Sequence, residues 1–276
     1  MITLMTASKK QEQSMNILYL ANSGVVFRRK NYQVVVDGLF NSDNPFSPPD
    51  EAFEQTPEDY IGDFDGETVL AFTHCHSDHF DIEKVERMMR RHSGIRCAYV
   101  PGFITNKEKI RRDGLDEMIC CFTENEKTIW FGGFYIAFSS TRHIPLSPDE
   151  SKACCAHCCI CIQADGQRWM LAGDAYPDFC TGGIGALVRG NDGVFLNPVF
   201  LGKRVWANQL RRESCKVPIY IYHLPDERKD TFLYRQTALR NYDRYMDRDP
   251  HLTLLTEPMT NIAAPNYTNY KHNRNY

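Results

Sequence analysis

The chain has 276 residues, of which 42% are hydrophobic and 24% are charged. This composition is typical of a globular protein with a sizeable core and excludes a disordered or fibrous chain. The formal net charge of −3 argues against a general nucleic-acid or membrane-surface binder. The 11 cysteines are an odd number that fits a disulfide framework poorly, so we expect reduced thiols or metal ligands in a cytoplasmic protein.

Both ends of the chain differ in composition from the rest. Residues 1–14 are mostly polar and are interpreted as a disordered extension, followed by a single domain over residues 15–260. The Asn- and Tyr-rich segment 261–276 is either a frayed tail or an arm onto a neighbouring subunit, which would make the protein a homo-oligomer. No stretch approaches the ~20 apolar residues of a transmembrane helix, so we expect no membrane partner.

The first half of the chain begins with strands and then mixes strands with helices. Runs of Val, Ile, Leu and Tyr separated by turn residues predict consecutive antiparallel strands. A short apolar run at 68–72 leads into a polar segment rich in histidine. The expected elements are strands at 16–20, 24–27 and 33–37, a helix at 82–91, a strand at 95–100, a helix at 105–113, a strand at 118–122 and a hairpin of 128–130 with 134–138.

The second half continues this mixture. Its expected elements are a hairpin of 156–163 with 168–171, a short helix at 181–188, a strand at 194–196, a helix at 204–213, a strand at 217–222, a helix at 231–246 and a strand at 252–255. Hairpinned strands bury one face against each other, and helices must cover the remaining apolar faces. The pattern therefore predicts a two-sheet core with helices outside it.

Four metal-binding side chains fall between His74 and His79, after the strand-like run and before a helix. If strand geometry persists, His74 and His76 point the same way, whereas Asp78 and His79 lie past the turn and can face a second point. Imidazole and carboxylate ligands suit Zn²⁺, with Mn²⁺ or Fe²⁺ as alternatives. The simpler alternative is a polar turn that happens to be rich in histidine.

The spacing His-x-His-x-Asp-His resembles the signature of the metallo-β-lactamase-fold hydrolases. The other parts of that family's pattern occur in the same order: a strand ending in Asp37, a loop histidine at His143, a Gly-Asp pair at Asp174 and a histidine after a late apolar strand at His223. The resemblance covers about residues 16–255. It implies an α/β fold with four αββα layers, two mixed β-sheets flanked by helices.

The resemblance also implies a role for each matched residue. Two metal ions would be bound on either side of a bridging carboxylate, and a further carboxylate would order the motif loop from behind the ligands. Asp78 and Asp174 would be the catalytic carboxylates. The implied ligands are His74, His76 and His143 for one metal, Asp78, His79 and His223 for the other, and Asp174 as the bridge, with Asp37 behind the loop.

Such a site implies a binuclear metal-dependent hydrolase, in which two divalent cations generate a metal-bound hydroxide near neutral pH. Two cations, two carboxylates and one hydroxide leave a net charge of about +1, which would also suit an anionic substrate. The expected substrate is a small ester, lactone or phosphoester. The alternatives are a phosphodiesterase or nuclease on the same fold and a non-catalytic metal-binding or sensing protein.

Other branches of the family fit less well. His76 stands where the redox-active diiron members have Glu, and the segments typical of transfer-RNA-processing members are absent. Classical antibiotic-degrading members are secreted, and the N-terminal region has no export signal. Elimination leaves a resemblance to the cytoplasmic group that includes the ascorbate-phosphate lactonase-like proteins.

The segment from Cys154 to Cys161 holds five cysteines. The spacing of Cys155 and Cys158 is compatible with a zinc or redox site. Cys159 and Cys161 alternate with isoleucines, however, so we expect a strand in which buried cysteines pack as small apolar side chains. An auxiliary metal or redox site remains the alternative.

Two further residues adjoin the expected ligands. Cys75, between His74 and His76, is expected to pack behind the motif loop. Tyr176 lies two residues after Asp174 and could reach a leaving group, although an ordinary packed tyrosine is the simpler interpretation.

Overall fold

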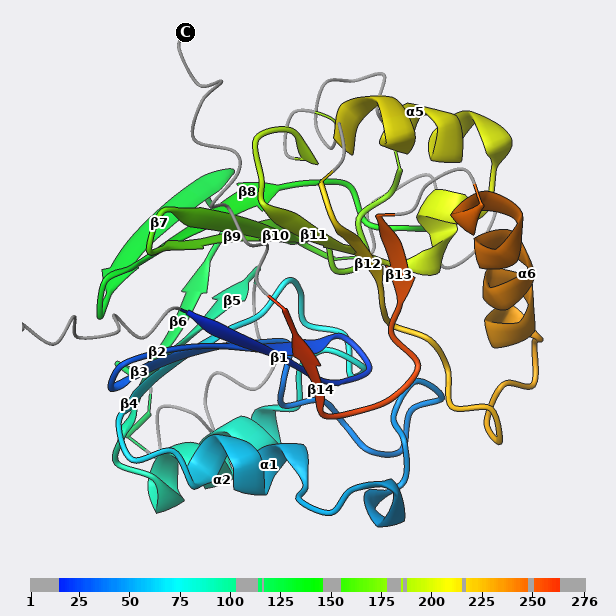
Figure 1. Ribbon diagram of the computed structural model, residues 1–276. Coiled ribbons are helices and arrows are strands. Elements are labelled where there is room, and N and C mark those ends of the chain that lie inside the picture. The colour runs from blue at the N-terminus through cyan, green and yellow to red at the C-terminus, as the bar shows by residue number, and fades with distance from the viewer. Residues whose placement is uncertain are drawn as a thin grey trace, which may run out of the picture.

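A computed structural model of the chain describes residues 15–102, 114–115, 117–145, 155–177, 185, 188–214, 217–247 and 251–263 (Figure 1). Within these residues the strands form two seven-stranded sheets that lie face to face. Helices α1 and α2 cover the outer face of the first sheet, and α5 and α6 lie outside the second (Figure 1). The predicted four-layer αββα sandwich is confirmed.

The first sheet has the strand order β14-β1-β2-β3-β4-β5-β6. Tight turns join β1, β2 and β3 as antiparallel neighbours, as the sequence predicted, and β3 to β6 run parallel. The elements on this side are β1 (Asn16–Ala21), β2 (Gly24–Arg29), β3 (Tyr32–Val36), α1 (Pro57–Gly62), β4 (Glu67–Ala71), α2 (Ile82–Arg91), β5 (Ile95–Pro101), β6 (Ile119–Phe122) and β14 (Thr260–Ile262).

The second sheet has the strand order β13-β12-β11-β10-β9-β8-β7. Strands β7 to β10 are antiparallel neighbours, and β10 to β13 run parallel. The elements are β7 (Glu126–Phe131), β8 (Phe134–Ser140), β9 (Cys158–Ala164), β10 (Gln167–Leu171), β11 (Gly193–Leu196), α5 (Arg204–Ser214), β12 (Ile219–Ile221), α6 (Tyr234–Met246) and β13 (Leu252–Leu254).

The main core lies between the two sheets. In β9, Ile160 and Ile162 point into it, whereas Cys159 points to the opposite face, in the apolar layer beneath α5. The predicted alternation of this cysteine-rich strand is therefore confirmed, because neighbouring residues of a strand face opposite sides of the sheet.

The helices differ from expectation in a few places. The short helix α1 was not predicted; the Thr56 side chain accepts a hydrogen bond from Asp59 N at its start. Helix α6 begins at Tyr234 instead of 231, because the Asp230 carboxylate accepts hydrogen bonds from the Tyr234 and Arg235 amides. The predicted helix at 105–113 and most of that at 181–188 lie outside the described residues. No helix in the described ranges is long and apolar enough to cross a membrane.

Strand β14 includes two residues of the segment that was interpreted as a tail. Asn261 and Ile262 pair with Leu18 and Ile17 of β1. Ile262 is buried in the core between the sheets, which is why this part of the segment is held in place.

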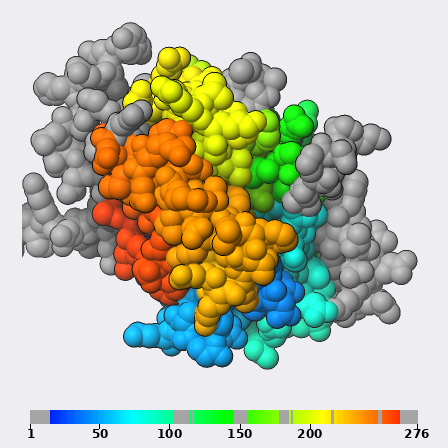
Figure 2. All heavy atoms as spheres, turned by 90° about the vertical axis from the view of Figure 1, so that its right-hand side faces the viewer, coloured from blue at the N-terminus to red at the C-terminus, as the bar shows by residue number. Residues whose placement is uncertain are grey.

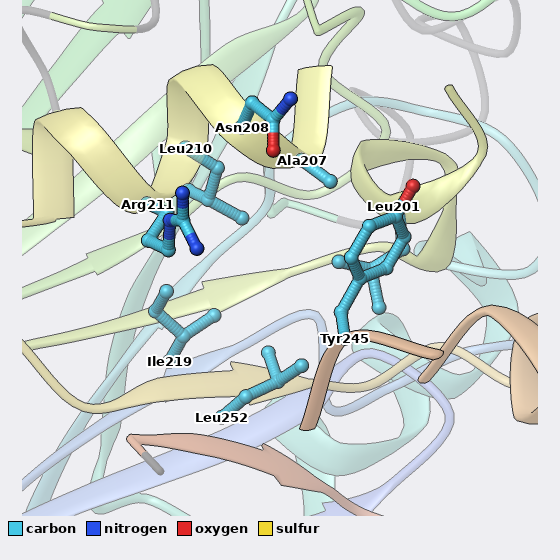
Figure 3. Close-up of a pocket in the computed structure, with 8 residues that line it drawn as sticks. All are labelled: Leu201, Ala207, Asn208, Leu210, Arg211, Ile219, Tyr245 and Leu252. Carbon is cyan, nitrogen blue, oxygen red and sulfur yellow. The ribbon is translucent and has the colours of Figure 1, made fainter. Parts of the chain in front are cut away.

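A small pocket lies on the outer side of the second sheet, between α5, α6 and strands β12 and β13 (Figure 3). Leu210, Ile219, Leu252 and Tyr245 line it, and its volume is about 20 Å³. That is room for about one water molecule, so this pocket is a packing defect and not a ligand site.

Candidate metal centre

The predicted ligands lie just beyond the ends of strands. The motif from His74 to His79 follows β4, His143 follows β8, Asp174 follows β10 and His223 follows β12. Strands β10 and β12 belong to the parallel part of the second sheet, so their carboxyl ends lie at one edge. Crevices at the carboxyl ends of parallel strands are common binding sites.

Asp37 fixes the start of the motif loop. The parallel register of β3 and β4 pairs Val36 with Ala71, which places Asp37 beside Thr73. The Asp37 carboxylate accepts hydrogen bonds from the Thr73 amide at 2.8 Å and the Thr73 hydroxyl at 2.7 Å. It also lies 2.9 Å from Nδ1 of His79. At the far end of the loop, Asp81 caps helix α2 through the amides of Glu83 and Lys84.

The first group of converging side chains is His74, His76, His143 and Cys155, whose ligand atoms all lie within 4.8 Å of one another. The Nε2 atoms of His74 and His143 are 3.3 Å apart. The three histidines were predicted from the sequence, but Cys155 was not predicted at this position.

The second group is Asp78, His79, Asp174 and His223, with ligand atoms again within 4.8 Å of one another. Nε2 of His223 lies 3.5 Å from Asp78 Oδ2 and 3.3 Å from Asp174 Oδ1. Nε2 of His79 lies 3.9 Å from Asp78 Oδ2. All seven predicted ligand residues are therefore brought together.

Asp174 lies between the two groups. Its Oδ1 is 3.6 Å from Nε2 of His79, and its Oδ2 is 3.6 Å from Nε2 of His143. Asn197, at the end of β11, donates hydrogen bonds to the carbonyls of Gly173 and Ala175 on either side of this aspartate. The carboxylate is thus held with one oxygen toward each group.

The donor atoms fit divalent cations. His79 Nε2 and Asp174 Oδ1 are buried and make no hydrogen bond of normal geometry to any described residue. Buried polar atoms are rarely left without a hydrogen bond, so a nitrogen and a carboxylate oxygen that face one point in this way suit a divalent cation. Imidazole nitrogens and carboxylate oxygens are ligands that zinc accepts in proteins.

In the metal-free centre, the protonation states of the histidines and the carboxylates depend strongly on one another. Burial by itself lowers the pKa of His79, but nearby carboxylates, Asp37 and Asp174 foremost, raise it well above its usual value. Burial acts to raise the pKa of Asp174, but His223 and His79 lower it well below its usual value. Burial, together with neighbouring histidines, lowers the pKa of His74. Asp174 is thus kept ionised and His74 neutral, which are the states that bind a metal, whereas the raised pKa of His79 keeps on it a proton that a bound metal would displace.

Asn22 supports the second group and was missed by the sequence analysis. It lies in the turn between β1 and β2 with a positive φ of 54°, and its side chain contacts Nδ1 of His223 at 2.5 Å. The same side chain donates a hydrogen bond to the carbonyl of Asp78. A polar turn residue gives no sign in the sequence that it will face a histidine 201 positions away.

The loop after β3 covers His223 from outside. The ring of Phe46 stacks on the His223 imidazole with centroids 4.1 Å apart. Lys229 donates hydrogen bonds to the carbonyls of Ser42, Asn44 and Ser47 and so fastens the loop to the segment before α6. Figure 2 shows these segments side by side, the loop in blue and the segment in orange.

His157 is a second residue that the sequence analysis missed. Its ring centroid lies 5.1 Å from that of His74 and 5.6 Å from that of His143, and Nδ1 contacts the Thr141 hydroxyl at 2.7 Å. Burial, together with His143, lowers the pKa of His157 to about 3. The side chain therefore stays neutral behind the first group.

The remaining cysteines mostly pack. Cys158, Cys159 and Cys161 are buried in β9, and Cys154 lies outside the described residues. Cys75 packs against the apolar layer under α2, as predicted, and a hydrogen bond with the Cys155 side chain lowers the pKa of Cys75 to about 6.

Tyr176 is positioned by aromatic contacts. Its ring lies edge-on to Trp206, with centroids 5.5 Å apart, and the Arg142 guanidinium lies 4.9 Å from its centroid. These contacts agree with the interpretation of a packed tyrosine.

Comparison with solved structures identifies the fold. The metallo-β-lactamase-fold protein YhfI of Bacillus subtilis superposes with a TM-score of 0.59 at 12% identity, over 90% of this chain and 98% of YhfI. The chain has the metallo-β-lactamase fold. No family model and no curated protein sequence matches it.

Two other solved structures that are similar to this chain belong to proteins with different chemistry. The isothiocyanate hydrolase from Delia radicum gut bacteria has a TM-score of 0.61 at 12% identity, over 90% of this chain and 99% of that one. CmlA of Streptomyces venezuelae, a diiron β-hydroxylase, has a TM-score of 0.55 at 15% identity, over 90% of this chain and 54% of CmlA. At these identities the similarity establishes the fold, and the chemistry must be argued from the residues.

Proposed function

We propose that this protein is a binuclear metal-dependent hydrolase acting on a small ester, lactone or phosphoester. The position of Asp174 carries the proposal, because its two oxygens face the two groups of ligands at 3.3–3.6 Å. A carboxylate in this position can bridge two cations. The donor set fits Zn²⁺, with Mn²⁺ or Fe²⁺ as alternatives.

The residues divide into two binding sets that share Asp174. His74, His76 and His143 hold one cation, and Asp78, His79 and His223 hold the other. Cations held there would supply a water whose pKa is lowered toward neutrality and would polarise the carbonyl or phosphoryl oxygen beside the carbon or phosphorus that the water attacks. Asp37 keeps Nδ1 of His79 occupied, so that Nε2 presents its lone pair to the site.

Asp78 and Asp174 are the carboxylates that touch the reacting centre in this proposal. We assign Asp174 to orienting the attacking water, since its depressed pKa keeps it ionised and able to accept a hydrogen bond. The Asp78 carboxylate also lies beside His223, and its negative charge adds to that of Asp174 in binding the cations. Asp78 and Asp174 both lie on loops that directly follow strands, and the strands hold these loops in place.

Within the fold, we place the protein with the ascorbate-phosphate lactonase-like group of cytoplasmic hydrolases. His76 supports this choice over the redox-active diiron members, and the net charge of −3 supports a small-molecule substrate over a nucleic acid. The alternative of a non-catalytic metal sensor is separated from this proposal by the experiment below.

Metal analysis beside turnover tests the proposal. Purified protein should hold two divalent cations per chain and turn over at least one member of a panel of esters, lactones and phosphodiesters. Asp174→Ala should lower both metal content and turnover, whereas Asp63→Ala, at an exposed aspartate outside the site, should change neither. Two bound metals without turnover of any panel member would favour the sensing protein, and cleavage of DNA or RNA alone would favour a nuclease.

A further inference from the structure

Cys155 joins the three histidines of the first group, although the predicted ligand set does not include it. Its thiol lies within 4.8 Å of the ligand atoms of His74, His76 and His143. The side chain is only half-buried, so the sulfur is at the edge of the centre and not locked into the core behind it.

We propose that Cys155 is a further protein ligand of the first metal ion, beside the three histidines and the shared Asp174, and that it binds as a thiolate. This proposal rests on the metal centre of the proposed function. It gives the first and the second metal ion different sets of ligands. The thiol proton passes to solvent when the metal binds, because only the thiolate is a ligand.

The geometry is compatible with binding of one ion by all four side chains of the group. Bonds of about 2.0–2.3 Å in a tetrahedral zinc site place the ligand atoms roughly 3.4–3.8 Å from one another. The four ligand atoms, within 4.8 Å of one another, need a contraction of only about 1 Å to reach that arrangement. The separation of 3.3 Å between His74 Nε2 and His143 Nε2 already meets it.

The placement singles out Cys155 among the cysteines of its segment. Cys158, three residues later, points into the core between the sheets, and Cys159 points into the layer under α5. Cys155 precedes β9, where the chain is not yet bound by strand pairing, and it can therefore face the histidines.

Two consequences follow for the centre. Three imidazoles, one thiolate and the shared Asp174 carboxylate would give the first ion five protein ligands, whereas the second ion would have four, so more room for water is left on the side of Asp78, His79 and His223. A soft thiolate also favours Zn²⁺ or Fe²⁺ over Mn²⁺ in the first site, whereas the second site has only nitrogen and oxygen ligands.

Cobalt substitution provides a test that does not depend on activity. Wild-type protein loaded with Co²⁺ should show a near-ultraviolet sulfur-to-cobalt charge-transfer band. Cys155→Ser should lose the band but still bind Co²⁺ at the second site. Cys120→Ser is the matched control, because Cys120 is a half-buried cysteine of β6 in the first sheet and is not in the group, and this variant should keep the band.

Zinc competition with a chelator supplies a second readout. Loss of an outer partner of a ligand commonly weakens metal binding by 10–100-fold, so loss of a direct ligand in Cys155→Ser should weaken first-site Zn²⁺ binding by roughly tenfold or more. Mn²⁺ binding should change less.

The outcomes separate this inference from the proposed function. Two bound metals and active protein without the charge-transfer band would overturn the thiolate ligand and leave the hydrolase intact. A band that survives in Cys155→Ser, or is lost in Cys120→Ser, would likewise overturn it. A band that depends on Cys155 in a protein without turnover would support the ligand and argue against the hydrolase.

Discussion

Oδ2 of Asp37 lies 2.9 Å from Nδ1 of His79, although 42 residues separate them in the sequence, and both side chains are fully buried. The contact holds a proton on Nδ1, so that Nε2, which faces Asp78 and Asp174, is the nitrogen that binds a metal once its own proton is displaced. A residue outside the ligand set therefore decides whether a ligand can bind.

Asp37→Asn should weaken metal binding at the second site by about 10–100-fold. The amide keeps the shape of the carboxylate but can present a donor to Nδ1, which would move the histidine proton to Nε2. Titration calorimetry with Zn²⁺ on metal-free protein measures the effect. Asp192→Asn is the matched control, a buried aspartate that accepts a hydrogen bond from the Arg168 amide at 2.7 Å in the second sheet. Equal affinities in both variants would contradict the tautomer argument.

Asn22→Gly should weaken the second site without disturbing the backbone. Asn22 has a φ of 54°, which glycine adopts without strain, so the substitution removes only the side chain that contacts His223 and Asp78. We expect a loss of about tenfold or more in second-site affinity. Lys30→Gly, at a turn residue with a φ of 53°, should leave metal binding unchanged. If both variants bind metal alike, Asn22 has no positioning role.

Gly173→Ala should destabilise the fold more than Gly166→Ala. Both glycines have a positive φ, 52° and 75°, so each alanine carries a similar backbone penalty of about 1 kcal/mol. A Cβ at Gly173 would also lie 2.5 Å from Thr73 Oγ1, whereas a Cβ at Gly166 meets nothing within 4 Å. Urea unfolding should give a loss of roughly 3 kcal/mol or more at Gly173 and about 1 kcal/mol at Gly166. Similar losses in the two variants would show that Thr73 and the backbone at position 173 move apart at little cost in stability.

His157→Asn should make the metal-free protein less sensitive to acid. Folding lowers the pKa of His157 from 6.5 to about 3. Between these two pH values the unfolded chain carries a proton on His157 that the folded protein does not carry. The part of the free energy of unfolding that depends on neutral His157 is fully present above pH 6.5. It is lost as the pH falls, at up to about 1.4 kcal/mol per pH unit. Asparagine can keep the contact with Thr141 but cannot titrate.

Urea unfolding of chelator-treated protein at pH 7 and pH 5 checks this prediction. The wild-type protein should lose roughly 2 kcal/mol more than His157→Asn between these two values. Identical losses would mean that His157 is already protonated in the folded state at pH 5.

The structure of the cysteine-rich segment was predicted only in part from its sequence pattern. Alternation in β9 predicted correctly which face Cys159 takes, because a strand has a strict period of two residues. Cys155 lies before the strand, where no period applies, and its place beside His74 and His143 depends on how the loop enters the sheet.

The sequence by itself determined the layered fold and the seven residues that converge on the metal centre. Each of these ligands follows a strand with a clear apolar pattern, and local rules govern where such strands end. Only the tertiary structure decided that Asn22, Cys155, His157 and Asn197 surround them. These four residues lie in turns, loops or strand ends, and their partners come from other parts of the two sheets. Contacts of that kind depend on sheet packing and loop paths, which leave no periodic signal in the chain.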